Sequence, residues 1–241
     1  MRILVVNDDG IDASGIVMLA KAARTFGDVT VVAPMGQRSA KSQSITVHGD
    51  VVAAKAGEFP VDGVSAWKIS GTPADCVRVG LWYAMKERPD LVLSGINAGF
   101  NTGYDIVYSG TVGAAKEAVM NGIPAIAFSI GDPGYLGEIE EFLEPMIRDL
   151  AARPIEAHSF WNVNFPKCRR EEIKGVLEDR FPAPEVYFQT KYIPKGEEAD
   201  GMHLEIRMTY PEKLVDGCDI QALFDGYISV GKVGHIVPET P

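Results

Sequence analysis

Two adjacent carboxylates, Asp8 and Asp9, are the first residues of the chain whose types suggest chemistry. They follow a short apolar run, Ile3–Val6, which is typical of a buried strand. Adjacent carboxylates repel each other unless a positive charge lies between them, and a hard cation such as Mg²⁺ or Mn²⁺ takes oxygen ligands of this kind. Because Asp-Gly is also common turn chemistry, the segment Asp8-Asp9-Gly10 alone leaves a metal site and a plain turn equally open.

A glycine-rich stretch, 95–103, follows another predicted core strand, Leu91–Leu93. The carboxyl ends of parallel strands meet at one edge of a sheet, so Asn97 is expected to come close to Asp8. Asn97 and Asn101 could each offer a neutral oxygen to a metal or an amide to a phosphate. Glycine and asparagine also favour ordinary surface loops, but a loop this long in a compact domain is more often functional.

The polar segment 37–44 follows the predicted strand Val29–Ala33 and is therefore expected near the same sheet edge. Ser39 in this segment could supply a hydroxyl ligand to a metal. Most polar stretches of this kind are solvated loops, so the segment is a weak indication by itself.

Ser109, Gly110 and Thr111 directly precede a predicted helix, Val112–Asn121. The first turn of a helix presents unpaired amides and a favourable dipole, which suit a phosphate group. Plain capping of the helix by Ser109 or Thr111 is the better interpretation of this tripeptide taken alone.

Several catalytic motifs are missing from the sequence. It has no Gly-x-Ser-x-Gly, no Walker Gly-Lys-Ser/Thr and no dinucleotide-binding glycine fingerprint after the first strand. The Asp-x-Asp spacing of phosphoaspartyl enzymes is absent too, which counts against Asp8 as a covalent nucleophile. The histidines lack metal-ligand spacing and are expected to be surface or packing residues; they are His48, His158, His203 and His235.

The elements that must position these residues alternate between short β-branched runs and longer helical patterns over the first two thirds of the chain. This alternation predicts βαβ units around a mostly parallel sheet, an α/β fold. Helices are expected at 15–26, at 73–86 behind an N-cap at Thr72, at 112–121 and at 138–152, and extended segments at 45–47, 64–69, 125–129 and 161–165. Beyond residue 171 the chain is expected to be strands and loops, including 186–188 and 227–230.

Composition narrows the class of partner. The chain has 241 residues and a formal net charge of −10, which works against binding a nucleic-acid polymer but not a small phosphorylated molecule. Its three scattered cysteines argue against a disulfide framework, and no apolar stretch suits a signal peptide or a membrane span. We therefore expect no membrane partner and a cytoplasmic location.

Separate motifs together resemble the survival protein E family, also called the stationary-phase survival family. The matching segments are Asn-Asp-Asp-Gly-Ile at 7–11, Gly-Thr-Pro-x-Asp-Cys-Val at 71–77, Ser-Gly-Ile-Asn-x-Gly-x-Asn-x-Gly at 94–103, Tyr-Ser-Gly-Thr-Val at 108–112 and Asn-Val-Asn-Phe-Pro at 162–166. Three departures stand out: Asp12 where the family usually has histidine, Ala40 where it has glycine, and Cys218 before Asp219 where it has threonine.

The resemblance implies a Rossmann-like three-layer α/β/α core over 1–170 and a β-rich oligomerisation extension over 171–241. It implies a homodimer or homotetramer that binds one divalent ion per subunit, Mg²⁺ or Mn²⁺, through Asp8, Asp9, Ser39 and Asn97. The implied activity is hydrolysis of nucleoside 5′-monophosphates, often of 3′-monophosphates, and in some members of short polyphosphate.

We expect Asp8 or Asp9 to orient a metal-bound water or to take its proton, and Asn101, Ser109, Gly110 and Thr111 to bind the phosphate. A nucleotide-binding sensor that holds its ligand on the same loops without turnover is the alternative.

Overall fold

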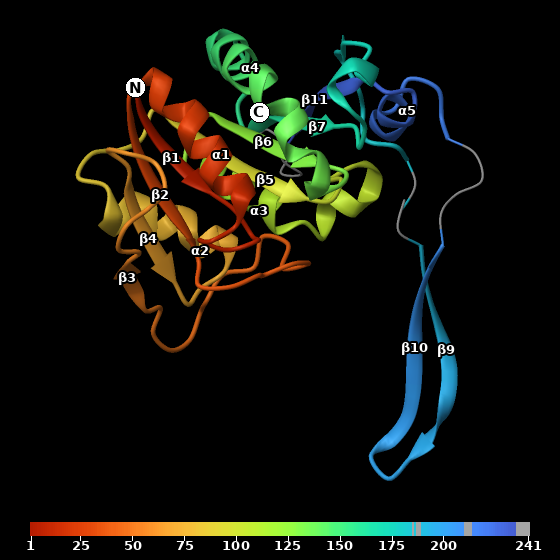
Figure 1. Cartoon of the computed structure of the whole chain (residues 1–241). Helices are drawn as coiled ribbons and strands as arrows, with labels where there is room; N and C mark the ends of the chain where they lie inside the picture. Colours follow the sequence, from red (N-terminus) through yellow and green to blue (C-terminus); the bar gives the residue numbers. More distant parts are fainter. Residues whose placement is uncertain (185, 187–188, 210–213, 235–241) are drawn as a thin grey trace, which may run out of the picture.

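The computed structural model describes residues 1–184, 186, 189–209 and 214–234 (Figure 1). The strands are β1 (Arg2–Val6), β2 (Asp28–Pro34), β3 (Ala53–Lys55), β4 (Ser65–Ile69), β5 (Leu91–Ala98), β6 (Ala125–Ile130), β7 (Ser159–Phe165), β8 (Val176–Leu177), β9 (Gln189–Glu198), β10 (Gly201–Thr209) and β11 (Ile228–Gly234). The α-helices are α1 (Ser14–Ala23), α2 (Pro73–Val79), α3 (Gly110–Met120), α4 (Glu140–Ala152) and α5 (Asp219–Phe224). Short 3-10 helices cover Arg24–Phe26, Gly103–Val107, Pro133–Ile139 and Arg170–Glu172, and a π-helical turn covers Gly80–Ala84.

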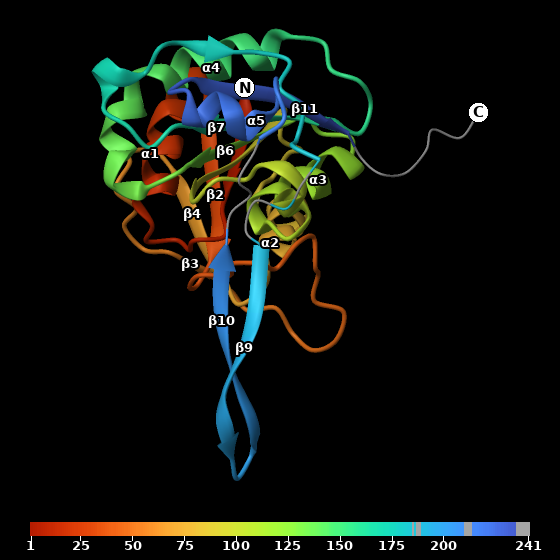
Figure 2. The same ribbon diagram turned by 90° about the vertical axis from the view of Figure 1, so that its right-hand side faces the viewer.

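The central sheet has nine strands in the order β3-β4-β2-β1-β5-β6-β7-β11-β8, and the pairs from β4 to β7 are all parallel. Alternate residues of β1 face opposite sides of it. Ile3 and Val5 belong to the apolar cluster that includes α1 and α4, whereas Leu4 and Val6 belong to the cluster that includes α2 and α3. Figure 2 shows the two pairs of helices on opposite faces of the sheet. The prediction of a three-layer α/β/α core is thus confirmed.

The strand order reverses beside β1. β1 pairs with β2 on one side and with β5 on the other, both in parallel. Such a reversal leaves a crevice beyond the carboxyl ends of the two strands, where open α/β sheets bind ligands. Asp8 follows the end of β1 and Asn97 lies near the end of β5, so the fold brings both to this crevice.

Most of the elements predicted from sequence are present, including the N-cap at Thr72, whose side chain accepts the Asp75 amide. The extended segment expected at 45–47 is not a strand; Thr46 is instead held by the buried Asp75 carboxylate, which accepts its amide and its hydroxyl. β5 also runs further than expected, to Ala98, so Asn97 lies on a strand rather than in a loop.

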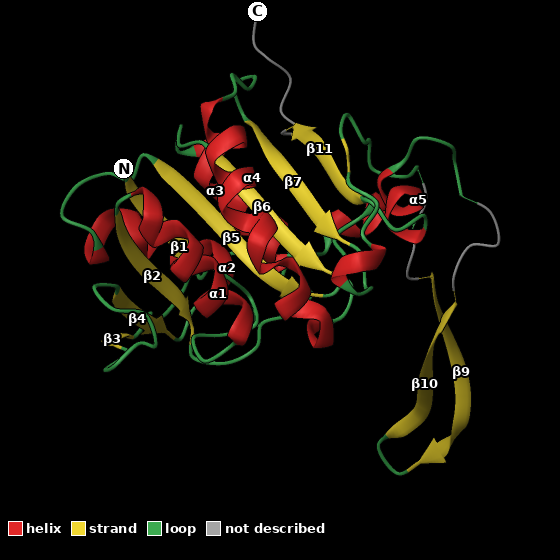
Figure 3. Cartoon of the chain, turned by 45° about the horizontal axis from the view of Figure 1, so that its top comes forward, coloured by secondary structure: helices red, strands yellow, loops and turns green. Residues whose placement is uncertain are grey.

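The C-terminal part differs more from expectation. β11 pairs antiparallel with β7 and parallel with β8 inside the central sheet (Figure 3), so the strand at 227–230 finds its partner within the chain. The short helix α5, which the sequence did not predict, packs beside it. The strand expected at 186–188 lies largely outside the described residues. β9 and β10 form an antiparallel hairpin that projects from the body (Figure 1).

Candidate functional site

The turn after β1 is shaped by Asn7, which is fully buried. Its Nδ2 donates to the Gly10 carbonyl at 2.8 Å, and its Oδ1 accepts the Gly10 amide at 3.2 Å. These two bonds close a tight turn around Asp8 and Asp9. The turn and the carboxylate pair are therefore the same structure, and the two interpretations of the sequence do not exclude each other.

Asp8 is buried against the N-terminus of α3. Its Oδ1 accepts a hydrogen bond of 2.5 Å from the Thr111 hydroxyl, and a Cβ on Gly110 would lie 3.0 Å from its Oδ2. Gly110 thus leaves room for this carboxylate. Burial raises the pKa of Asp8 from 3.8 to about 6, the Thr111 hydrogen bond opposes the rise, and the charge of Asp9 adds to it.

Asp9 and Asn97 are linked through the end of β5. The Ala98 amide donates to Asp9 Oδ2 at 3.0 Å, while Asn97 Nδ2 donates to the Gly99 carbonyl at 2.8 Å. Because its nitrogen is used in this way, Asn97 keeps its side-chain oxygen as the group it can offer to a ligand.

The loop that carries Ser39 is pinned to the same place. The Arg38 amide donates to the Asp8 carbonyl at 2.6 Å, and the Ser42 amide donates to the Tyr108 carbonyl at 2.9 Å. A Cβ on Gly113 would lie 2.1 Å from the Ser42 carbonyl oxygen, so this glycine lets the loop lie on α3. Ser39 itself is exposed and lines the cavity described below.

The Ser109 hydroxyl accepts the Val112 amide at 3.1 Å, which makes Ser109 the N-cap of α3. The Thr111 hydroxyl donates its hydrogen bond to the Asp8 carboxylate. The capping alternative therefore describes one function of Ser109, and Thr111 holds a carboxylate. Binding of phosphate by Ser109, Gly110 and Thr111 stays a prediction, which rests on the amides of the first helical turn.

Asn101 is buried and is hydrogen-bonded to two asparagines of β7, which sequence reasoning did not single out as site residues. Its carbonyl oxygen accepts from Nδ2 of both Asn162 and Asn164 at 3.0 Å, and its amide donates to Asn164 Oδ1 at 2.9 Å. Its Nδ2 donates to the Ser129 hydroxyl at 2.8 Å. The only sequence signal for this clamp was the Asn-x-Asn pattern at 162–164.

Asp219 is a further residue that sequence reasoning did not assign to the site. Its buried carboxylate accepts the amides of Gly103 at 2.9 Å, Ala183 at 3.0 Å and Ile220 at 2.7 Å. Burial raises its pKa above the ordinary value, against the effect of these hydrogen bonds. Asp219 thereby joins the C-terminal segment to the loop that carries Asn101.

A cavity of about 780 Å³ opens at the crevice. Asp8, Ser39, Asn97, Asn101 and Ser109 line one part of it, together with residues of the hairpin. Asp9 lies on a neighbouring cavity of about 270 Å³, which shares Ala98 with the first. Of the described residues that line the larger cavity, none is a lysine, arginine or histidine, while two are aspartates.

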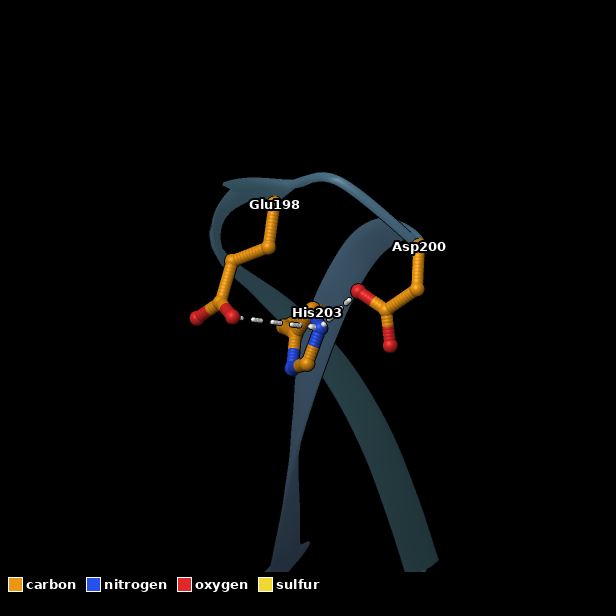
Figure 4. Close-up of side chains that lie close together, drawn as sticks. All are labelled: Glu198, Asp200 and His203. Carbon is orange, nitrogen blue, oxygen red and sulfur yellow. Dashed lines mark hydrogen bonds and ion pairs between the residues drawn. The ribbon is translucent and has the colours of Figure 1, made fainter.

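A separate group of possible metal ligands lies at the tip of the hairpin. His203 Nε2 is 2.9 Å from Asp200 Oδ1 and 3.8 Å from Glu198 Oε2, and all three residues are exposed (Figure 4). His203 was expected to be a surface or packing residue, and it is exposed. This cluster could compete for cations added in a binding experiment.

The described residues include no helix long and apolar enough to cross a membrane. Cys76, Cys168 and Cys218 are free thiols in the structure.

Comparisons with known proteins agree with this fold. The family model described as "Survival protein SurE" matches residues 3–181. A protein of Brevibacillus brevis named "5'-nucleotidase SurE" is 36% identical over 98% of this chain and 91% of its own length, and one of Thermoanaerobacter sp. with the same name is 39% identical over 95% and 90%. The crystal structure of the SurE protein of Aquifex aeolicus superposes with a TM-score of 0.84 at 33% identity, covering 98% of this chain and 95% of that one. The chain therefore belongs to the survival protein SurE family.

Proposed function

We propose that this chain is a divalent-metal-dependent phosphomonoesterase that hydrolyses nucleoside 5′-monophosphates to nucleoside and phosphate. We include 3′-monophosphates and short polyphosphate as further substrates, because each presents a terminal phosphate to the same polar part of the cavity. The nucleotidase names of relatives that align along most of the chain support the substrate class.

One observation carries the metal dependence. The cavity contains carboxylates and no basic side chain among its described lining residues, so a phosphate dianion would meet only negative charge there. A divalent cation is the partner that both the carboxylates and the phosphate require. Mg²⁺ and Mn²⁺ suit the donors, which are all oxygens.

The residues present fit one such ion. Asp8 and Asp9 supply carboxylates, Ser39 a hydroxyl, and Asn97 the side-chain oxygen that its own hydrogen bond leaves available. When bound, the ion would acidify a water molecule and neutralise charge on the phosphate.

The protein's own groups have separate tasks in this proposal. Thr111 holds Asp8 in place through its hydroxyl, and the Ala98 amide does the same for Asp9. One of the two aspartates orients the attacking water or accepts its proton. The amides at the start of α3, together with Asn101, hold the phosphate.

The decisive experiment is AMP hydrolysis after removal of metals with a chelator and after addition of Mn²⁺ or Mg²⁺. We expect turnover to vanish and to return. Full activity in excess chelator would overturn the metal dependence, and AMP binding without turnover under any metal would favour the sensor. Metal stoichiometry should be measured in a His203→Ala background, which disables the hairpin cluster; it should be one ion per subunit, and Asp9→Asn in that background should abolish it.

We also propose a homodimer or homotetramer whose assembly uses the C-terminal segment, as expected from sequence. The hairpin supports this, because β10 exposes a row of apolar side chains on one face: Met202, Leu204, Ile206 and Met208. A two-stranded ribbon of this kind is marginal without a surface to pack on. Nucleic-acid polymers are not partners in this proposal.

A further inference from the structure

The large cavity has a second group of lining residues that the proposed hydrolysis does not use. These side chains are aromatic or apolar, and they come from the loop after β5, from the turn before α3, and from the hairpin and the chain that leads into it: Phe100, Tyr108, Val186, Tyr192 and Met208. Two of the three rings are strongly exposed, Tyr108 at 58% and Tyr192 at 63%. Exposed aromatic rings around a cavity are typical of a surface that a flat ligand covers.

The register of the hairpin explains why its residues face the cavity together. Thr190 and Tyr192 are two residues apart on β9 and so point to the same side. Met208 on β10 pairs directly with Thr190. One face at the base of the ribbon thus contributes three side chains to the cavity wall.

The other two rings, those of Phe100 and Tyr108, belong to residues whose positions are fixed by packing or by backbone hydrogen bonds. A Cβ on Gly131 would lie 2.3 Å from the Phe100 ring, so the ring occupies the space that this glycine leaves, and it also packs on the cluster around α5. Tyr108 donates its amide to the Asp105 carbonyl at 3.0 Å and accepts the Ser42 amide on its own carbonyl. Ser109, the N-cap of α3 that follows Tyr108, lines the same cavity. A ligand with its phosphate at α3 would therefore extend toward these rings.

We propose that this aromatic group, Phe100, Tyr108 and Tyr192 with Met208, is the subsite for the nucleobase, and that Tyr192 brings the hairpin into substrate binding. The inference rests on the proposed nucleotidase function. A cavity of about 780 Å³ is within the range of small-molecule sites, roughly 300–1,000 Å³, and has room for a whole nucleotide. Stacking does not read hydrogen-bonding edges, so the subsite accepts every base and favours purines, which have the larger ring system.

The test compares AMP with ribose 5-phosphate, which has the same phosphate and sugar but no base. We expect the wild-type protein to prefer AMP in kcat/KM, mainly through KM. Tyr192→Ala should lower kcat/KM for AMP by roughly five- to 150-fold, the range of one base–aromatic stacking contact. It should leave ribose 5-phosphate within about twofold, because that substrate makes no such contact. Tyr192→Phe should keep the preference for AMP.

The matched control is Lys191→Ala, which truncates an exposed residue next to Tyr192 on β9 that points to the other side of the ribbon and lies outside the cavity lining. It should leave both substrates unchanged. Equal kcat/KM values for AMP and ribose 5-phosphate in the wild type would overturn the subsite. Equal losses of kcat/KM for both substrates in Tyr192→Ala would overturn it as well. Calorimetric binding of the two compounds makes the same comparison without turnover, so an inactive protein would refute the nucleotidase proposal while the subsite is still tested.

Discussion

Replacing Asp8 with asparagine should stabilise the metal-free protein at pH 8 while it removes activity. Asp8 is 4% exposed, lies beside a second aspartate and is bonded by Thr111. Asparagine has nearly the same shape, and its Oδ1 can accept the same hydroxyl. The substitution therefore removes the buried charge and retains the hydrogen bond.

The magnitude follows from the pKa of Asp8, which burial raises from 3.8 to about 6. Below pH 3.8 the Asp8 carboxyl group is protonated in both the folded and the unfolded state, so its raised pKa does not lower the free energy of unfolding there. Ionisation in the unfolded chain then costs stability progressively, and above pH 6 the full penalty is present. A shift of about two units corresponds to about 3 kcal/mol, which Asp8→Asn avoids.

Urea unfolding in the presence of chelator at pH 5 and pH 8 measures this difference. The stability gain of Asp8→Asn should be about 3 kcal/mol at pH 8 and about half of that at pH 5, which lies between the two pKa values. Asp12→Asn is the control, because it removes the same charge from an exposed position close by in the sequence. A gain that does not depend on pH, or a variant less stable than the wild type at pH 8, would refute the reasoning. With Mn²⁺ present the wild type should be more stable than Asp8→Asn, because the ion binds the intact carboxylate pair. The kcat of Asp8→Asn should be lower than that of the wild type by on the order of a hundredfold or more.

Three further predictions concern other parts of the chain. Thr111→Val should raise the pKa of Asp8 further and lower kcat more than it raises KM, whereas Thr111→Ser should retain both; a rise confined to KM in a steady-state assay would assign Thr111 to the substrate instead. Ala40 adopts a φ of 55°, so Ala40→Gly should raise the free energy of unfolding by about 0.5–1 kcal/mol in urea titrations, and a loss would show that this conformation carries no strain. Replacing the hairpin, residues 189–209, with a short linker should dissociate the oligomer in light scattering and leave a folded monomer. Truncation after Arg170 should instead unfold the chain, because β11 is then lost from the sheet. An oligomer of unchanged subunit number without the hairpin would refute the role of the hairpin in assembly.

Local patterns predicted the sheet and most helices because their signals are short-range. Apolar runs, Thr72-Pro73 at a helix start and Ser109 before α3 each act within a few residues. The same patterns placed Asp8 and Asn97 at one sheet edge, since parallel strands carry their ends to a common side. The failures lie where tertiary contacts decide: 45–47 has strand-like alternation, yet Thr46 is bound by Asp75 from α2 rather than by a neighbouring strand.

The contacts that complete the site could not be found in this way, because they join distant segments whose residue types are ordinary. Asp219 lies 116 positions from Gly103 and binds its amide, so the loop that carries Asn101 is shaped partly by a helix near the end of the chain. β11 binds β7 next to Asn162 and Asn164, the residues that clamp Asn101. Asp219 and β11 therefore support the part of the cavity lining that contains Asn101, whereas the hairpin contributes Thr190, Tyr192 and Met208. A division of the chain near residue 170 into a catalytic core and a separate assembly element would remove β11 from the sheet and Asp219 from the loop that carries Asn101, and for this reason we expect the segment after residue 170 to serve the cavity as well as the oligomer.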